Sequence, residues 1–169
     1  MPEQHYVYLI PGFLGFTQVG EIAYFHHVRE VLEEGFRRAK TPVLVTEIYT
    51  HPTASIRKRA ARVFEVLQET AGQSGPNHLV GHSTGGLDAR LFTTPNATLR
   101  LEHPDAIESL ASRVESVVSV ATPHYGAPIA AYLSSVMGAK IMRLLAFAII
   151  YTMEFGKMPL SALRSEEHT

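Results

Sequence analysis

One short stretch, residues 81–86 (GHSTGG), has the spacing of a serine nucleophile held on a tight turn between a strand and a helix. Such a turn accepts only small residues two positions to either side of the serine, and Gly81 and Gly85 meet that requirement. The serine hydroxyl would then stand near the N-terminus of the following helix, where free N–H groups favour developing negative charge. We therefore predict that Ser83 is the nucleophile of an acyl-transfer reaction.

A second glycine-containing loop, residues 11–16 (PGFLGF), lies early in the chain, directly after an apolar run. An oxyanion loop is expected at this place. Its predicted contribution is the backbone N–H of Phe13, which together with that of Thr84 would donate to the carbonyl oxygen of a substrate as it gains charge. Taken without Ser83, the same residues are also compatible with a plain loop between a strand and a helix.

The sequence around these loops predicts the elements that would position them. Apolar runs and apolar spacing predict strands at 6–10, 42–49, 78–80 and 114–121, and helices at 21–38, 56–67 and 87–92. Residues 94–113 are polar and rich in turn formers. Strands that alternate with helices in this order predict an α/β fold in which a mostly parallel sheet has helices on both faces, with the site at the strand ends.

The composition is that of an ordinary globular protein: 169 residues, 46% apolar and 18% charged, enough for one sizeable core. A net charge of −1 gives no overall field to attract nucleic acid or an anionic membrane. The absence of cysteine excludes disulfides and thiolate metal sites. The first four residues, MPEQ, lack the features of a signal peptide, so the sequence as written predicts a cytoplasmic location.

Two groups of polar residues are interpreted as solvated surface. His26 and His27 are adjacent on a predicted helix, so they point in different directions and cannot share a metal ion from one face. A basic cluster in the next helix lacks the aromatic residues and glycine-rich turns of a nucleic-acid site; it comprises Arg57, Lys58, Arg59 and Arg62. The sequence therefore predicts no metal, no cofactor and no nucleic-acid partner.

Residues 129–155 are unusually apolar, and 144–153 form an almost continuous apolar run. That run is shorter than the roughly 20 residues that span a membrane, and Arg143 interrupts it. One or two helices forming a lid over the site, at about 129–160, would present apolar surface to an acyl chain. A buried core helix and an interfacial membrane helix are the alternatives.

Three motifs together, at 81–90, 11–16 and 121–126 (ATPHYG), resemble those of bacterial lipase/esterase-type α/β-hydrolases. They occur in the order of that family, although Pro11 stands where many relatives have histidine. The resemblance implies an α/β-hydrolase fold and a small-molecule or lipid ester as substrate. The site residues that it implies are Ser83 as nucleophile, Phe13 and Thr84 as oxyanion donors, Gly81 and Gly85 as elbow glycines, and His82, His124 and Tyr125 flanking the pocket.

Two catalytic partners of that family have no convincing match. The family places an acid and then a histidine after the serine, and the histidines that follow Ser83 here are His103, His124 and His168. Of the acids, Asp88 lies one turn along the helix after the serine and points away, and Asp105 precedes the strand at 114–121. None of these residues is well placed as a base or an orienting acid.

The last six residues, 164–169 (RSEEHT), look like the translated start of a common DNA-sequencing adapter and are predicted to be a non-native tail. The sequence then predicts a single α/β-hydrolase domain over 1–163 that is C-terminally truncated, so that the fold is incomplete and the acid and histidine are missing.

The predicted function is cleavage of carboxylic esters through an acyl-enzyme on Ser83. An acyltransferase or thioesterase on the same scaffold would use the same nucleophile, and a non-catalytic binding module would keep the fold with an inert serine. Contact with a lipid interface is compatible with the apolar segment, and the sequence makes no prediction of oligomeric state.

Overall fold

The computed structural model describes residues 2–12, 18–19, 22–23, 25–51, 54–72, 74–97, 99, 104–128, 140 and 144. The chain divides into two compact units, Met1–Tyr125 and Gly126–Thr169. In the second unit the described residues are 126–128, 140 and 144. The predicted lid at about 129–160 therefore lies outside the described residues except at 140 and 144, and the predicted tail lies wholly outside them.

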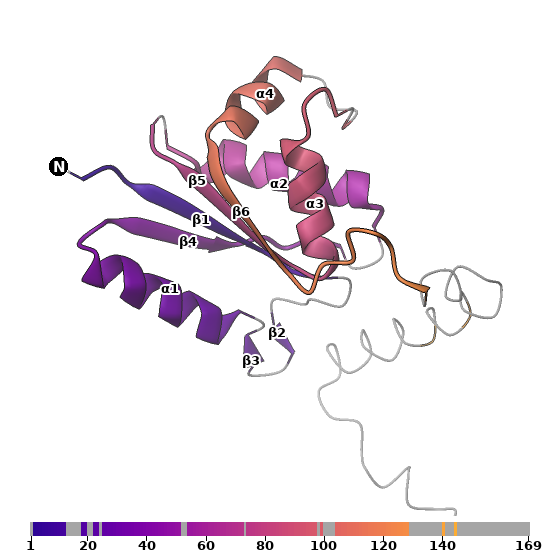
Figure 1. The fold of residues 1–169 in the computed structure, drawn as a ribbon, viewed down its shortest axis with the longest axis horizontal. Helices are drawn as coiled ribbons and strands as arrows, with labels where there is room; N and C mark the ends of the chain where they lie inside the picture. The colour runs from indigo at the N-terminus through magenta and orange to yellow at the C-terminus, as the bar shows by residue number, and fades with distance from the viewer. Residues whose placement is uncertain are drawn as a thin grey trace, which may run out of the picture. The chain divides into compact units, whose positions relative to one another are not determined.

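Among the described residues of the first unit, four strands form one parallel sheet (Figure 1). They are β1 (His5–Ile10), β4 (Val43–Glu47), β5 (Asn77–His82) and β6 (Val114–Val120), in the order β4-β1-β5-β6. All three strand pairs are parallel, so the carboxyl ends of the strands meet at one edge of the sheet. The prediction of a parallel sheet is confirmed. Two short strands, β2 (Gln18–Val19) and β3 (Ile22–Ala23), form a separate antiparallel pair.

Helices cover both faces of this sheet, as the sequence predicts (Figure 1). On one face, α1 (His26–Arg38) packs through Leu32 and Phe36 against a core formed by Val7, Leu9, Phe25 and Val45. The opposite face carries a larger core, covered by α2 (Ile56–Thr70), α3 (Thr84–Thr93) and α4 (Pro104–Ser112). Because side chains alternate along a strand, β1 contributes to both cores, and its last four residues are buried.

The first helix is shorter than its apolar spacing predicts. It begins at His26 rather than at residue 21, because Ile22 and Ala23 pair with Gln18 and Val19 in the β2–β3 ribbon. Val28, which the spacing places with the apolar residues, is 40% exposed. Apolar spacing alone does not distinguish a helix turn from a short strand that pairs with residues a few positions away.

Helix α4 lies within a stretch that the sequence analysis interprets as polar and turn-rich. Ala106, Ile107 and Leu110 pack against the larger core. Their spacing of one and three residues fits one face of a helix, which the sequence analysis did not assign in this stretch. Helix α4 packs near Val114, at the amino end of β6, whereas Ser83 follows the carboxyl end of β5. The additional helix therefore does not change the site.

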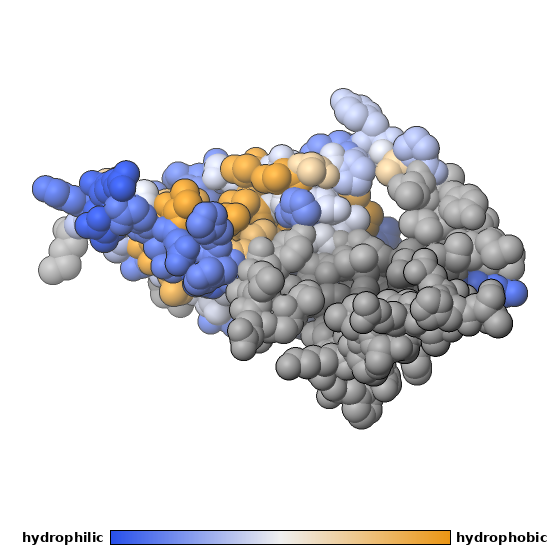
Figure 2. Space-filling model, turned by 90° about the horizontal axis from the view of Figure 1, so that it is seen from below, coloured by the Kyte–Doolittle hydropathy of each residue, from blue (hydrophilic) through white to orange (hydrophobic). Residues whose placement is uncertain are grey.

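Strand β6 is much more exposed than the strands beside it. Val117, Val118 and Val120 are 41%, 48% and 46% exposed, whereas Leu79 of the neighbouring β5 is fully buried. The register pairs Val118 with Val80, which packs on the α1 side of the sheet. Figure 2 views the molecule from below Figure 1 and shows exposed apolar side chains on the described part of that side.

No helix within the described part of the chain is long and apolar enough to cross a membrane.

Candidate functional site

Ser83 lies at the carboxyl end of β5 and is the residue that precedes α3. Its backbone angles are φ 53° and ψ −124°, a region that costs a residue with a side chain about 1–3 kcal/mol. The turn is held by backbone hydrogen bonds: the Ser83 N–H donates to Val120 O (2.8 Å), and Ser83 O accepts from the Gly86 N–H (3.2 Å). The strained strand-to-helix turn that the motif predicts is therefore present.

Gly81 and Gly85 have no room for a side chain. A Cβ atom at Gly85 would lie 2.7 Å from the carbonyl oxygen of Pro11 and closer still to that of Ile10. One at Gly81 would lie 2.5 Å from backbone atoms of Gly85 and Gly86. These neighbours are backbone atoms of the sheet and of α3, so they cannot rotate away. In this backbone, only glycine fits at either position.

Gly12 brings the loop after β1 into contact with Ser83. A Cβ atom built on Gly12 would lie 2.7 Å from Ser83 Cβ, 3.2 Å from Ser83 Oγ and 3.3 Å from His82 O. Contact this close requires glycine, and it places the backbone of residue 12 directly beside the serine side chain. Phe13, the predicted oxyanion donor, is the next residue and lies outside the described residues.

Thr84, the other predicted oxyanion donor, is the first residue of α3. The first N–H groups of a helix have no partner within it and lie at the positive end of its dipole. The Thr84 side chain is half-buried, and within the described part of the chain its buried Oγ1 has no hydrogen-bond partner.

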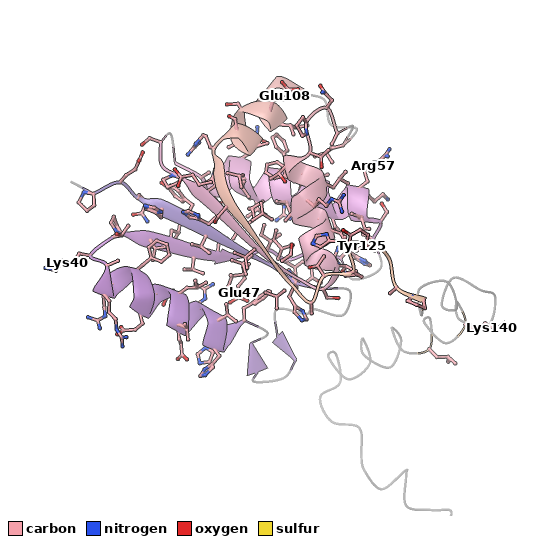
Figure 3. The ribbon with its side chains drawn as sticks, viewed as in Figure 1. Lys40, Glu47, Arg57, Glu108, Tyr125 and Lys140 are labelled. Atoms are coloured by element: carbon pink, nitrogen blue, oxygen red, sulfur yellow. The ribbon has the colours of Figure 1, made fainter. Side chains whose placement is uncertain are left out.

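The loop after β6 lies against the start of α3. Thr122 lies against Gly86, where a Cβ atom would come within 2.8 Å of Thr122 Cγ2. The His124 N–H donates to Thr122 O (2.9 Å), and the buried His124 Nδ1 has no hydrogen-bond partner among the described residues. Tyr125 is fully exposed at the end of this loop (Figure 3). His82, which directly precedes Ser83, is half-buried.

The prediction that the basic cluster of α2 lies in solvent is wrong for one of its four residues, Arg59. Arg59 is 3% exposed, and its partner Asp88 in α3 is fully buried. Arg59 Nε and Nη2 donate to Asp88 Oδ2 at 2.8 and 2.7 Å, Nη2 also donates to Pro11 O at 2.6 Å, and Nη1 donates to Gly12 O at 3.4 Å. Arg59 is buried because these acceptors, from two distant parts of the sequence, converge on it.

The other three members of the cluster meet the prediction. Arg57 and Lys58 are exposed, and Arg62 forms a surface ion pair with Glu65 (2.9 Å). Figure 3 shows Arg57 at the outer side of α2.

Asp88 is an acid of α3 that faces Arg59 rather than a histidine. Burial raises the pKa of its carboxyl group to about 6, because the cost of desolvation exceeds the lowering by the Arg59 hydrogen bond and charge. Its second oxygen, Oδ1, is buried and has no hydrogen-bond partner among the described residues. Asp88 is thus joined through Arg59 to the loop after β1. That it points away from Ser83 stays a prediction.

A histidine pair lies at the opposite edge of the sheet from Ser83. His5 Nδ1 lies 2.9 Å from His78 Nε2, and His78 Nδ1 lies 2.8 Å from Ser116 Oγ. Burial, followed by the charge of His5, lowers the pKa of His78. The sequence analysis did not single out these residues, which come from the amino ends of three strands.

His26 and His27 are exposed on α1, and both lie within 3.4 Å of Glu30. Within the described part of the chain, no group of histidine, cysteine or acidic side chains could hold a metal ion.

The residues of the three motifs that the structure describes therefore meet at the carboxyl edge of the sheet: Gly12, Ser83 with its glycines, Thr84 and the loop at 121–125. The hydrogen bonds described for Ser83 are all made by its backbone. His103 and His168 lie outside the described residues, and nothing is described of the side chain of Asp105. The sequence analysis did not predict a role for Arg59 at the site. In the sequence, Arg59 is one of four basic residues of the same helix, and no local feature distinguishes it from the other three.

Comparison with known proteins finds a distant structural similarity. No protein-family model and no curated protein matches the chain. One solved structure that matches is the crystal structure of the metagenomic carboxyl esterase MGS0156, with a TM-score of 0.47 and 23% identity. The match covers 75% of this chain and 33% of that one, so the chain spans about a third of the length of the esterase. A similarity this distant does not establish a family.

Proposed function

We propose that this chain carries the nucleophile of a serine hydrolase that cleaves carboxylic esters through an acyl-enzyme on Ser83. The observation that carries the proposal is the backbone of Ser83, held at φ 53° between a buried parallel strand and a helix, with Gly12 against its side chain. A non-glycine residue held in this conformation at the carboxyl edge of a sheet points to function rather than to stability, because the strain must be offset by surrounding contacts.

In the proposed reaction, Ser83 Oγ attacks the ester carbonyl carbon and transfers its proton to a general base. The carbonyl oxygen becomes an alkoxide, which accepts hydrogen bonds from the backbone N–H groups of Thr84 and Phe13. Collapse of this intermediate expels the alcohol, which takes up the proton, and leaves Ser83 acylated. Water then attacks the acyl group in the same way, releasing the carboxylic acid and restoring the serine.

The base and the acid that orients it are proposed to lie outside the described residues. Asp88 is not available as that acid because Arg59 occupies its carboxylate. The described histidine nearest to Ser83 along the later sequence, His124, is half-buried. Among the described residues its Nδ1 has no partner, so no acid–histidine hydrogen bond of a triad is made there.

The test uses the chain extended through its native reading frame past Leu163, with two variants. The extended protein is expected to hydrolyse p-nitrophenyl butyrate and to react with a fluorophosphonate, with mass spectrometry placing the adduct on Ser83. Ser83→Ala should abolish both reactions, and Ser74→Ala, a change at an exposed serine in a distant loop, should affect neither. Full esterase activity in Ser83→Ala would overturn the proposal.

Two other outcomes of the same test would replace the proposal by a different function. Transfer of the acyl group to an added alcohol or thiol in preference to water would indicate an acyltransferase or thioesterase, which uses the same acyl-enzyme. A correctly folded extended protein that resists the fluorophosphonate would indicate a non-catalytic binding module.

A further inference from the structure

A buried arginine connects the loop after β1 with the helix that follows Ser83. Arg59 lies in α2, its carboxylate partner Asp88 lies in α3, and its carbonyl partners Pro11 and Gly12 follow β1. Since α3 begins directly after Ser83, one guanidinium joins the nucleophile's helix to the backbone that lies against the nucleophile's side chain.

The geometry of these contacts requires arginine. The acceptors are Asp88 Oδ2 and two carbonyl oxygens, and Nε, Nη1 and Nη2 all donate to them. A guanidinium presents its donors in a fixed planar fork, so it holds several acceptors in one arrangement. A lysine ammonium at the same place would carry the charge but could not span all three acceptors.

We propose that Arg59, anchored by Asp88, is a positioning residue that fixes the backbone of Pro11 and Gly12 beside Ser83. The inference rests on the proposed function, in which the N–H that follows Gly12 stabilises the alkoxide. Gly12 already contacts Ser83, so a small displacement of its backbone changes the position of that N–H relative to the reacting carbonyl. Donors of this kind are effective only when they are held in place before the reaction.

A purely structural role for the pair is the alternative, and the two roles predict different results. Buried ion pairs contribute little to stability on average, because desolvation offsets their attraction. If Arg59 only stabilised the fold, every variant that remained folded would react with a fluorophosphonate at the normal rate. If Arg59 positions residues 11–12, the rate falls in folded protein.

The experiment compares Arg59→Met and Arg59→Lys with a matched control, Arg57→Met, which changes an exposed arginine of the same helix (Figure 3). Thermal unfolding of each variant sets a temperature at which all are folded. At that temperature we measure two quantities: the rate of fluorophosphonate labelling of Ser83 in the extended protein, and hydrogen exchange at the Gly12 amide.

We expect Arg59→Met to label about 10- to 100-fold more slowly than the unchanged protein, and its Gly12 amide to exchange faster. Arg59→Lys keeps the charge pair with Asp88, so it should recover most of the thermal stability but little of the labelling rate. Arg57→Met should match the unchanged protein in both measurements. If Arg59→Met fails to fold, Arg59→Lys decides the question.

Failure of this inference is distinguishable from failure of the proposed function. Normal labelling in folded Arg59→Met and Arg59→Lys would overturn the positioning role and leave the proposed function intact. Absence of labelling in the unchanged protein would overturn the proposed function.

Discussion

At the scale of single residues, the strained backbone of Ser83 is held by hydrogen bonds to Val120 and Gly86 and by the close approach of Gly12. Its N–H donates to the end of β6, while glycines at 12 and 85 let the loop after β1 and the first turn of α3 approach closely. The strain is local, but the groups that offset it come from three separate segments. Changes to these glycines should therefore cost stability even though they remove no contact.

Gly85→Ala is expected to lower the free energy of unfolding by about 1–3 kcal/mol, because the new methyl group would meet the carbonyl oxygens of Ile10 and Pro11, which are backbone atoms. Urea denaturation followed by circular dichroism measures the change. Gly35→Ala provides the control: nothing lies within 4 Å of its added methyl group. At this exposed position of α1 the substitution should stabilise the protein by about 0.5–1 kcal/mol. Equal effects of the two substitutions would contradict the packing argument.

At the scale of elements, α2 and α3 pack against one another and against the sheet, and the Arg59–Asp88 pair lies within this packing. Packing between the two helices buries the pair, and this burial raises the pKa of Asp88. The Asp88 carboxyl group is fully buried, and one of its oxygens has no hydrogen-bond partner among the described residues. Such a group is less stable as an anion than the same group in water. The pair therefore makes the stability of this region depend on pH.

The Asp88 contribution to stability should fall as pH rises from about 4 to about 6. Its pKa is raised from 3.8 to about 6, so in this range the folded protein keeps a proton that the unfolded chain has released. The contribution is present below pH 4 and lost above pH 6, and its size is roughly 3 kcal/mol.

Urea denaturation of the unchanged protein and of Asp88→Asn at pH 4, 5, 6 and 7 measures this effect. The asparagine does not titrate, so the difference in unfolding free energy between the two proteins should change across the range. A constant difference from pH 4 to pH 7 would show that folding does not raise the pKa of Asp88.

At the scale of the whole molecule, the described sheet has one well-covered part and one open part. β1 and β5 lie in the middle under helices on both faces, whereas β6 forms an edge and most of its residues are exposed. The proposed nucleophile, Ser83, and the proposed oxyanion donor Thr84 belong to the covered part. The base and the acid are proposed to lie outside the described residues.

The 169-residue chain should accordingly hydrolyse p-nitrophenyl butyrate at least about 10⁴-fold more slowly than the chain extended past Leu163, because loss of triad members has an effect of this size. Steady-state rates of both proteins, with Ser83→Ala as background, measure the ratio. Comparable rates in the two proteins would mean that a base within residues 1–169 serves Ser83, and His124→Ala would then be the next variant to test.

Much of the fold was predictable because the sequence signals for it are local. Apolar runs identified all four strands of the sheet, and the apolar spacing of α2 and α3 identified those helices to within a few residues. The start of α1 and the existence of α4 were not predicted correctly. In both places the deciding factor was pairing or packing with other residues, which spacing within one segment does not encode.

The sequence by itself determined the turn that holds Ser83, because the serine, its flanking glycines and the strand before it lie within a few residues of one another. Only the tertiary structure decided the environment of Arg59. In the sequence it is one of four basic residues in a helix, and it is buried because Asp88, Pro11 and Gly12 meet at that position. The physical reason is that backbone conformation depends mainly on neighbouring residues, whereas the burial of a charge depends on which distant groups are present to accept its hydrogen bonds.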